Sequence, residues 1–209
     1  MSNNHNHPTK GSSIIVEPIR SIQHIIEIRK ILRSTSLRDD LLFTMGINNS
    51  LRITDLLQIK VEDIRHKPMG TCLTIKEHKA GKENILVINP VVYQALQDYI
   101  RRMLHYNYSK EWVYLFQSRK GGKPLSLSSV NAKVKKWTLD VGLIGNYGAQ
   151  SLRKTWGFHQ KTRFGVSFNV LCKRFNHSSP AHTMRYLGIL EEKTDYILAS
   201  NEIGVISYR

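Results

Sequence analysis

The sequence lacks the features that staple small secreted proteins or anchor proteins in a membrane. It contains only two cysteines, Cys72 and Cys172, which form no CxxC pair, so we expect both to be reduced and structural. No apolar run approaches the roughly 18 residues of a spanning helix. The polar start, residues 1–13, has no apolar stretch of a signal peptide. These absences predict a soluble protein of the cytoplasm.

Acidic residues and the common phosphate or metal motifs are also scarce. The 16 acidic residues face 31 lysines and arginines, which gives a formal net charge of +15. Such an excess costs self-repulsion, and a polyanionic partner is the usual reason for it. Nucleic acid is favoured as that partner, with an anionic membrane surface second. There is no glycine-rich phosphate loop, no HExxH and no carboxylate cluster for Mg²⁺. We therefore expect neither metal nor cofactor.

The apolar spacing predicts an α+β protein, mainly helical with a small antiparallel sheet. The 209 residues fit one domain, expected over 18–209 after a disordered arm at 1–17. Apolar residues recur at helical spacing over residues 18–33 and 127–141. Further helices are expected to begin at Ser36, after a break at 46–50, at Pro90 and after Gly148, and a second break is expected at 176–180. Alternating residues around Gly81 predict a β-hairpin from 72–76 and 84–89.

Phosphate chemistry without metal needs cations for the developing charge and a nucleophile from the protein itself. Arg52 follows a polar turn and precedes Asp55, a carboxylate that could orient its guanidinium. Arg153 lies in the last predicted helical region. His177 comes later, and Tyr186 follows it by nine residues. Each also has a purely structural interpretation. The arginines could form surface ion pairs, His177 could be a neighbour of a helix N-cap, and Tyr186 could be a half-buried tyrosine.

Three stretches resemble the conserved boxes of the tyrosine recombinases, the phage integrase family. They are residues 41–64 (LLFTMGINNSLRITDLLQIKVEDI), 151–160 (SLRKTWGFHQ) and 175–189 (FNHSSPAHTMRYLGI). The resemblance covers essentially the whole predicted domain, and the order of its residues along the chain is specific. It implies the catalytic-domain fold of that family and cutting and rejoining of double-stranded DNA without metal or ATP.

The resemblance also implies a role for each residue. Arg52 and Arg153 would hold the scissile phosphate, and His177 would add a hydrogen bond. Tyr186 would attack to give a 3′-phosphotyrosine. Lys79, in the hairpin turn, would protonate the leaving 5′ oxygen. A terminal segment, residues 190–209, would dock on a neighbouring protomer of a tetramer on DNA, or else pack on its own domain.

Gln150 departs from the family pattern, which has a histidine at this position. Glutamine can form hydrogen bonds but cannot take a proton near neutral pH. Activity could be reduced, and the main alternative is a DNA-binding relative that has lost turnover. A more distant alternative is a general DNA- or RNA-binding module. A second departure is length, because only residues 1–17 precede the first expected helix, whereas family members commonly carry an N-terminal clamp domain. We therefore expect either a naturally minimal recombinase or a catalytic domain on its own.

Further basic residues are candidates for contacts with the DNA backbone. Lys133, Lys135 and Lys136 lie on the predicted helix 127–141, Lys82 lies in the hairpin, and Lys154 follows Arg153. Phosphate contacts of this kind fix register and give salt-dependent affinity. The other interpretation is an ordinary solvated surface.

Overall fold

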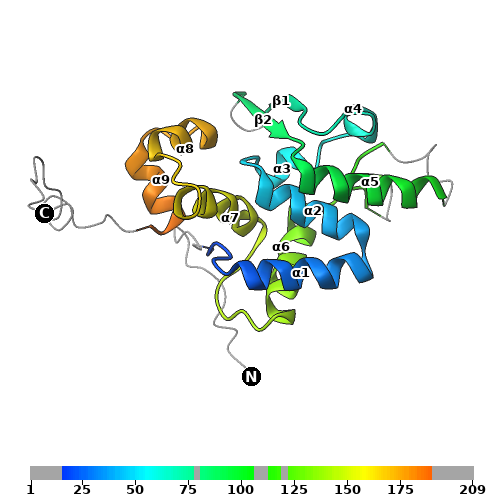
Figure 1. Cartoon of the computed structure of the whole chain (residues 1–209), viewed down its shortest axis with the longest axis horizontal. Coiled ribbons are helices and arrows are strands. Elements are labelled where there is room, and N and C mark those ends of the chain that lie inside the picture. Colours follow the sequence, from blue (N-terminus) through cyan, green and yellow to red (C-terminus); the bar gives the residue numbers. More distant parts are fainter. Residues whose placement is uncertain (1–15, 78–80, 106–112, 119–121, 190–209) are drawn as a thin grey trace, which may run out of the picture.

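The computed structural model describes residues 16–77, 81–105, 113–118 and 122–189. Its helices are α1 (Ile22–Thr35), α2 (Leu37–Asn48), α3 (Ile53–Leu56), α4 (Val61–Ile64), α5 (Pro90–His105), α6 (Leu127–Asp140), α7 (Ala149–Thr162), α8 (Phe168–Phe175) and α9 (Pro180–Leu187). Two strands, β1 (Cys72–Lys76) and β2 (Glu83–Val87), form one antiparallel sheet. The expected mainly helical α+β fold with a small sheet is confirmed (Figure 1).

Helix starts follow the capping residues visible in the sequence. Ser36 accepts a hydrogen bond from the Asp39 backbone N–H and begins α2 as expected, and Pro90 begins α5. The first helix starts later than expected, at Ile22, because Pro18–Arg20 run extended against α7. There the Ile19 N–H donates to Thr155 Oγ1 at 2.8 Å. Tertiary contacts thus override the helical spacing of the first four residues.

Gly46 does not end α2, contrary to the expected break at residues 46–50. The helix runs on to Asn48, because Gly46 serves close packing rather than a turn. A Cβ at Gly46 would lie 2.8 Å from Leu152 Cδ1 on α7. The missing side chain lets α2 and α7 approach closely in the centre of the molecule.

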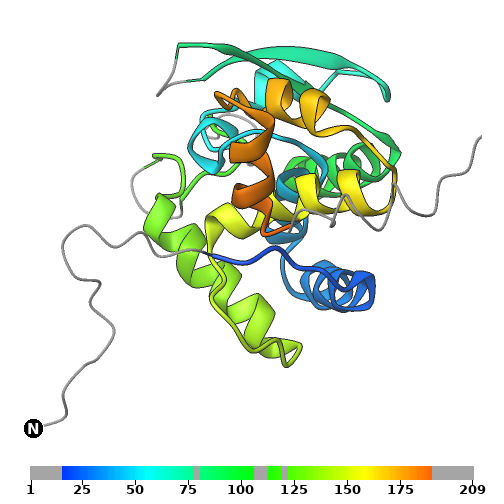
Figure 2. The ribbon, with the colours of Figure 1, turned by 90° about the vertical axis from the view of Figure 1, so that its left-hand side faces the viewer.

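The hairpin forms as expected, although β2 spans Glu83–Val87 rather than residues 84–89. It pairs Cys72 with Val87 and Lys76 with Glu83. Its base is held to the helical body by Asn49, whose side-chain carbonyl accepts from the Val87 N–H at 2.7 Å. Seen after a 90° turn, the hairpin lies along the top of the molecule and α9 lies below it (Figure 2). Strand β2 of the hairpin is linked directly to α8, because the Asn84 side chain donates to the Arg174 carbonyl.

A small second apolar cluster forms where α8 and α9 pack on α7. Its buried members are Leu171, Phe175 and Leu187, with Trp156 and Tyr186 packed partly against them. Gly157 on α7 makes this packing possible, since a Cβ there would overlap Phe175 and lie 2.8 Å from Leu187 Cδ2. The position of Tyr186 on α9 therefore depends on the small size of Gly157 in the middle of α7.

Gly157→Ala is expected to destabilise the protein in spite of the better helix propensity of alanine. Alanine is favoured over glycine by about 1 kcal/mol in a helix, whereas overpacking costs about 1–3 kcal/mol. Because Phe175 is a rigid ring, we expect overpacking to dominate and the midpoint of urea unfolding to fall. A variant as stable as wild type would show that α8 and α9 can shift freely on α7.

Within the described residues, no helix is both long enough and apolar enough to cross a membrane.

Candidate active site

Two arginines from distant parts of the chain meet beside the hairpin. Arg52 occupies the residue before α3, and its side chain is one-quarter exposed. Arg153 projects from α7 and is 3% exposed. Its Nη2 donates to the Phe175 carbonyl at 2.8 Å, and its guanidinium carbon lies 5.0 Å from the centre of the Phe175 ring. The expected pair of arginines is therefore brought together by α3 and α7.

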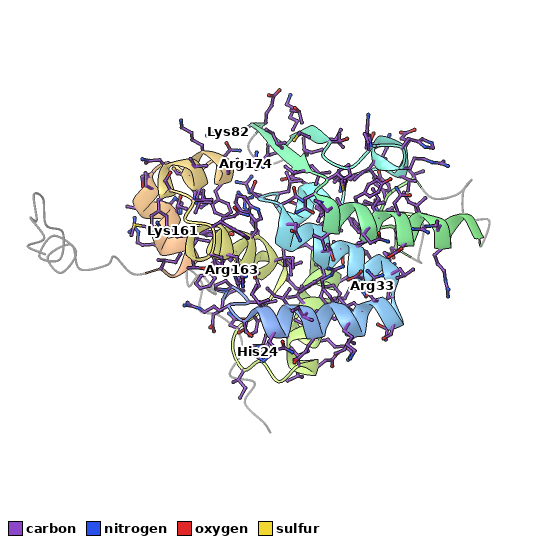
Figure 3. The ribbon with its side chains drawn as sticks, viewed as in Figure 1. His24, Arg33, Lys82, Lys161, Arg163 and Arg174 are labelled. Atoms are coloured by element: carbon purple, nitrogen blue, oxygen red, sulfur yellow. The ribbon has the colours of Figure 1, made fainter. Side chains whose placement is uncertain are left out.

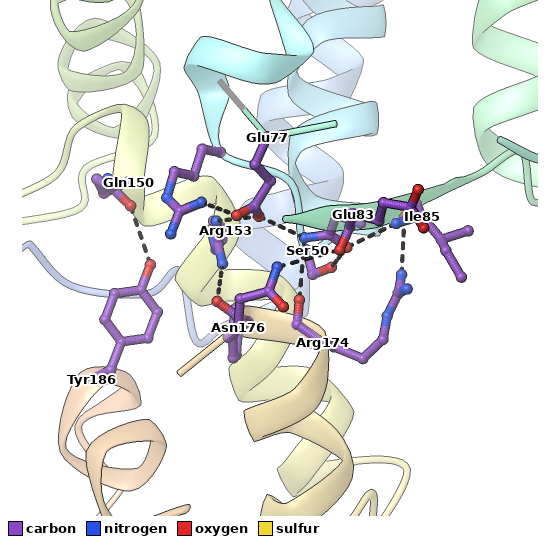
Figure 4. A network of polar contacts seen from close by, with 12 residues as sticks. Ser50, Glu77, Glu83, Ile85, Gln150, Arg153, Arg174, Asn176 and Tyr186 are labelled. Atoms are coloured by element: carbon purple, nitrogen blue, oxygen red, sulfur yellow. Dashed lines mark hydrogen bonds and ion pairs between the residues drawn. The ribbon is translucent and has the colours of Figure 1, made fainter. Parts of the chain in front are cut away.

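A buried carboxylate lies between these arginines. Glu77, just after β1, is fully buried and forms an ion pair with Arg52, and Arg153 Nη1 lies 3.9 Å from its Oε1 (Figure 4). Burial alone would raise the pKa of Glu77, but hydrogen bonds from Asn84 and Arg52 and the charges of Arg52 and Arg153 lower it. Sequence reasoning missed Glu77, because the expected partner of Arg52 was Asp55.

Tyr186 faces this cluster from α9. Its hydroxyl donates to Gln150 Oε1 at 3.2 Å, across 36 residues of sequence (Figure 4). Burial raises the pKa of the Tyr186 phenol, while the positive charges of Arg153 and Arg52 act to lower it. The phenol is thus within electrostatic reach of the arginine pair. Its hydroxyl donates a hydrogen bond to the Gln150 amide, which cannot accept the proton itself.

His177 lies beside the Tyr186 ring, after the left-handed C-cap residue Asn176 that ends α8. Its ring stacks on Phe175 and His182, at centroid distances of 5.1 and 4.5 Å, and meets Tyr186 edge-on at 4.9 Å. Nδ1 is 3.0 Å from Thr183 Oγ1. Burial and the nearby positive charges lower the pKa of His177 to about 4, so the ring is neutral at pH 7. The charge of the cluster therefore comes from the arginines.

Lys154 lies beneath the tyrosine rather than on an open surface. It is 6% exposed, and its Nζ is 4.8 Å from the centre of the Tyr186 ring. Burial lowers the pKa of Lys154, which the charge of Glu17 partly offsets. Lys154, the predicted contact to the DNA backbone, thus packs against the tyrosine ring.

The other predicted DNA contacts lie on the surface. Lys82 is exposed on the hairpin near Arg174 (Figure 3), whereas Lys79 lies outside the described residues. On α6, Lys133 pairs with Asp39 at 2.6 Å and Lys136 with Asp140 at 2.7 Å. Lys135 is exposed. The structure therefore places none of the α6 lysines in the arginine cluster.

No group of three or more His, Cys, Asp or Glu side chains suited to a metal ion occurs in the described part of the chain. The positive charges of the cluster described above are those of the Arg52 and Arg153 side chains. What the arrangement offers chemically is a pair of guanidiniums for one phosphate and a phenol directed toward them. Arg153 Nη1, buried and without a hydrogen-bond partner among the described residues, is a donor left over for a ligand.

Comparison with known proteins decides the family. The family model described as "Phage integrase family" matches residues 18–193, most of the chain. This chain belongs to the phage integrase family. A relative described as "Probable integrase/recombinase YoeC" from Bacillus subtilis (strain 168) is 36% identical over 182 residues, covering 86% of this chain and 93% of the relative. The resemblance seen in the conserved boxes is confirmed, and the family supports DNA strand transfer in general.

Other phage integrase relatives are longer than this chain. "Tyrosine recombinase XerA" of Pyrococcus horikoshii is 24% identical over 161 residues, which cover 77% of this chain but only 54% of the relative. The chain thus spans about half of such recombinases, although it covers nearly all of the Bacillus subtilis relative.

Solved structures confirm the catalytic-domain fold. The crystal structure of XerA recombinase superposes with a TM-score of 0.71 at 17% identity, over 90% of this chain and 67% of the other. A post-cleavage complex of the XerH site-specific recombinase with its difH substrate gives a TM-score of 0.69 at 17% identity, over 91% and 53%. At such identities the likeness concerns the fold.

Proposed function

We propose that this phage integrase homologue cuts and rejoins double-stranded DNA through a 3′-phosphotyrosine formed on Tyr186, without metal or ATP. The observation that carries the proposal is the convergence of Tyr186 on Arg153, which is buried, and Arg52, whose side chain is one-quarter exposed. Residues separated by more than 130 positions supply a nucleophile and two phosphate ligands to one place. Binding DNA alone would not require a partly buried phenol beside the proposed phosphate ligands.

The proposed reaction exchanges one phosphodiester for another. The Tyr186 oxygen attacks the scissile phosphorus, the bond to the 5′ oxygen breaks, and a 3′-phosphotyrosine forms. Lys79 donates the proton that the 5′ oxygen takes up, and the phenol releases its own proton to solvent water, because Gln150 cannot accept it. A 5′ hydroxyl from a second strand then reverses the step. Because each step keeps one phosphodiester bond, no external energy source is needed.

The two guanidiniums stabilise the charge that develops on the phosphate oxygens. Guanidinium offers two parallel donors to a phosphate, which an ammonium group does not. Arg153 Nη1 is buried, so its interaction with a phosphate is screened little by water. His177, neutral at pH 7, contributes a hydrogen bond rather than charge.

The proposed partner is duplex DNA, by analogy with the XerH recombinase, whose structure is bound to its difH substrate. The DNA backbone is proposed to contact five lysines: Lys82, Lys133, Lys135, Lys136 and Lys154. Three of these, Lys133, Lys136 and Lys154, would first have to give up their present contacts. Residues 190–209, outside the described part, are proposed to link protomers of a tetramer. Residues 1–17 are proposed as an arm, although Glu17 already donates its N–H to Asn146.

Gln150 favours a second candidate function, a relative that binds DNA but turns over poorly. The amide accepts the phenolic hydrogen bond but cannot take the proton as the phenol attacks. A base that is missing in this way lowers the rate by about 10²–10⁴-fold. The two functions therefore differ in rate and share the fold and DNA affinity.

A covalent trap on nicked site DNA distinguishes the two functions. Wild type, incubated in chelator, is expected to give a protein–DNA band on a denaturing gel, and peptide mapping is expected to find the DNA on Tyr186. Gln150→His is expected to form the band at least about tenfold faster. Its rate should rise with pH through the imidazole range, because only the neutral ring accepts a proton.

The control for this trap is Gln160→His, which adds a histidine to the same helix away from the phenol. A band in Gln150→His but not in wild type supports the impaired relative. No band in either protein, on DNA that both bind, contradicts strand transfer.

A further inference from the structure

The feature that the proposed chemistry leaves unexplained is the carboxylate inside its phosphate site. Glu77 is fully buried between Arg52 and Arg153, where a negative charge opposes the binding of a phosphate. Its lowered pKa keeps it ionised throughout the neutral range. A buried charge is costly unless it is paired, so its retention at this position needs a reason.

The reason lies in the arginines themselves. Burial and then the positive charge of Arg52 lower the pKa of Arg153, and the charges of Tyr186 and Glu77 act in the opposite direction. Without the anion between them, we expect the two guanidiniums to repel each other and move apart. Arg52, one-quarter exposed at the start of a four-residue helix, is the one free to move.

Glu77 is itself held in a fixed orientation. Asn84 on β2 donates to its Oε1 at 2.9 Å, and Ser50 donates to Asn84 at 3.0 Å. The same Asn84 amide reaches the Arg174 carbonyl at 3.2 Å, so the hairpin, α3 and α8 all meet here (Figure 4). The carboxylate thus has partners from several elements on both sides of the site.

We propose that Glu77 is a positioning residue for strand transfer, which keeps Arg52 and Arg153 aligned on the scissile phosphate before DNA arrives. The inference rests on the proposed function of the arginines. Glu77 touches neither the phosphate nor the phenol, and it acts through the guanidiniums. It follows that removing its charge makes the site more positive while leaving it less well aligned.

The test measures DNA affinity and single-turnover cleavage for Glu77→Gln on two nicked substrates. One carries the normal scissile phosphate, and the other a methylphosphonate, which lacks the negative charge that aligned arginines neutralise. Glu83→Gln, on the exposed side of the same hairpin, removes the same charge and is the matched control. Glu77→Asp keeps the charge on a shorter side chain.

For Glu77→Gln we expect DNA affinity equal to or tighter than wild type, with cleavage of the phosphate about 10²-fold slower. On the methylphosphonate the deficit relative to wild type should nearly disappear. Glu77→Asp should recover part of the rate, and Glu83→Gln should match wild type. The ratio of the two substrates within one variant does not depend on how much of that variant is folded.

Each other outcome counts against Glu77 or against the function. Equal deficits on both substrates would mean that Glu77 acts only through folding, and an unchanged rate would mean that the arginines need no alignment. Either result overturns the positioning role while wild-type cleavage stands. Failure of wild type to cleave would overturn the proposed function, and the role of Glu77 with it.

Discussion

Tyr186→Phe is expected to abolish the covalent protein–DNA adduct while leaving DNA affinity unchanged. The substitution removes only the hydroxyl, whose contact is with the exposed side chain of Gln150. The ring keeps its contacts with Phe175 and Lys154, so the free energy of unfolding should change by less than about 1 kcal/mol. Loss of a covalent nucleophile can cost on the order of 10⁶-fold, which places any residual band below detection.

Tyr93→Phe is the control for this experiment, because Tyr93 is half-buried against the main core on α5. It should form adduct at the wild-type rate. Affinity is best followed by fluorescence anisotropy at several salt concentrations, since phosphate contacts set its salt dependence. A band that persists in Tyr186→Phe would assign the attack to another residue and remove the central role of α9.

Arg153→Lys is expected to slow single-turnover cleavage by about 10²–10³-fold, as when a donor to a developing oxyanion is lost. Lysine keeps the charge but lacks the planar fork that serves the Phe175 carbonyl on one side and a phosphate on the other. The unpaired carbonyl and the reduced support for Glu77 should also lower the free energy of unfolding by about 1–3 kcal/mol.

Arg33→Lys is the matched control, since Arg33 lies exposed on α1 and forms an ion pair with Asp98 on α5. It should change neither cleavage nor the unfolding midpoint measurably. Cleavage is measured on nicked DNA with enzyme in excess, so that slow release of product does not limit the rate. A wild-type rate for Arg153→Lys would show that charge alone is enough at this position.

Much of the fold could be predicted from the sequence, because its start signals act locally. Ser36, Pro90 and the alternation on both sides of Gly81 each specify an element through neighbouring residues. The errors came where distant residues decide. The four residues before Ile22 do not join the first helix, because they make contacts with α7. Gly46 lies within a helix rather than ending it, because Leu152 packs where a side chain at residue 46 would lie.

The site was predictable only as far as family boxes mark it. Arg52, Arg153, His177 and Tyr186 were expected together, and the structure gathers them. Glu77 carries no local signal, because its burial arises from the meeting of the hairpin with α3 and α7. Lys154 was expected on DNA and lies under the tyrosine ring. Charge counting cannot tell a lysine that packs inward from one that faces solvent.

The contact of Ile19 with α7 also bears on the order of events during synthesis. It joins residues 136 positions apart, and Arg20 reaches the Gly188 carbonyl across 168 positions. Contacts this distant in sequence form late, after the intervening chain has left the ribosome. The helix that carries Tyr186 can therefore pack only after the segment before α1 and α7 are both available, and a nascent chain that already holds Arg52 still lacks the proposed nucleophile. Assembly of the proposed site therefore depends on the packing of segments that leave the ribosome far apart in time.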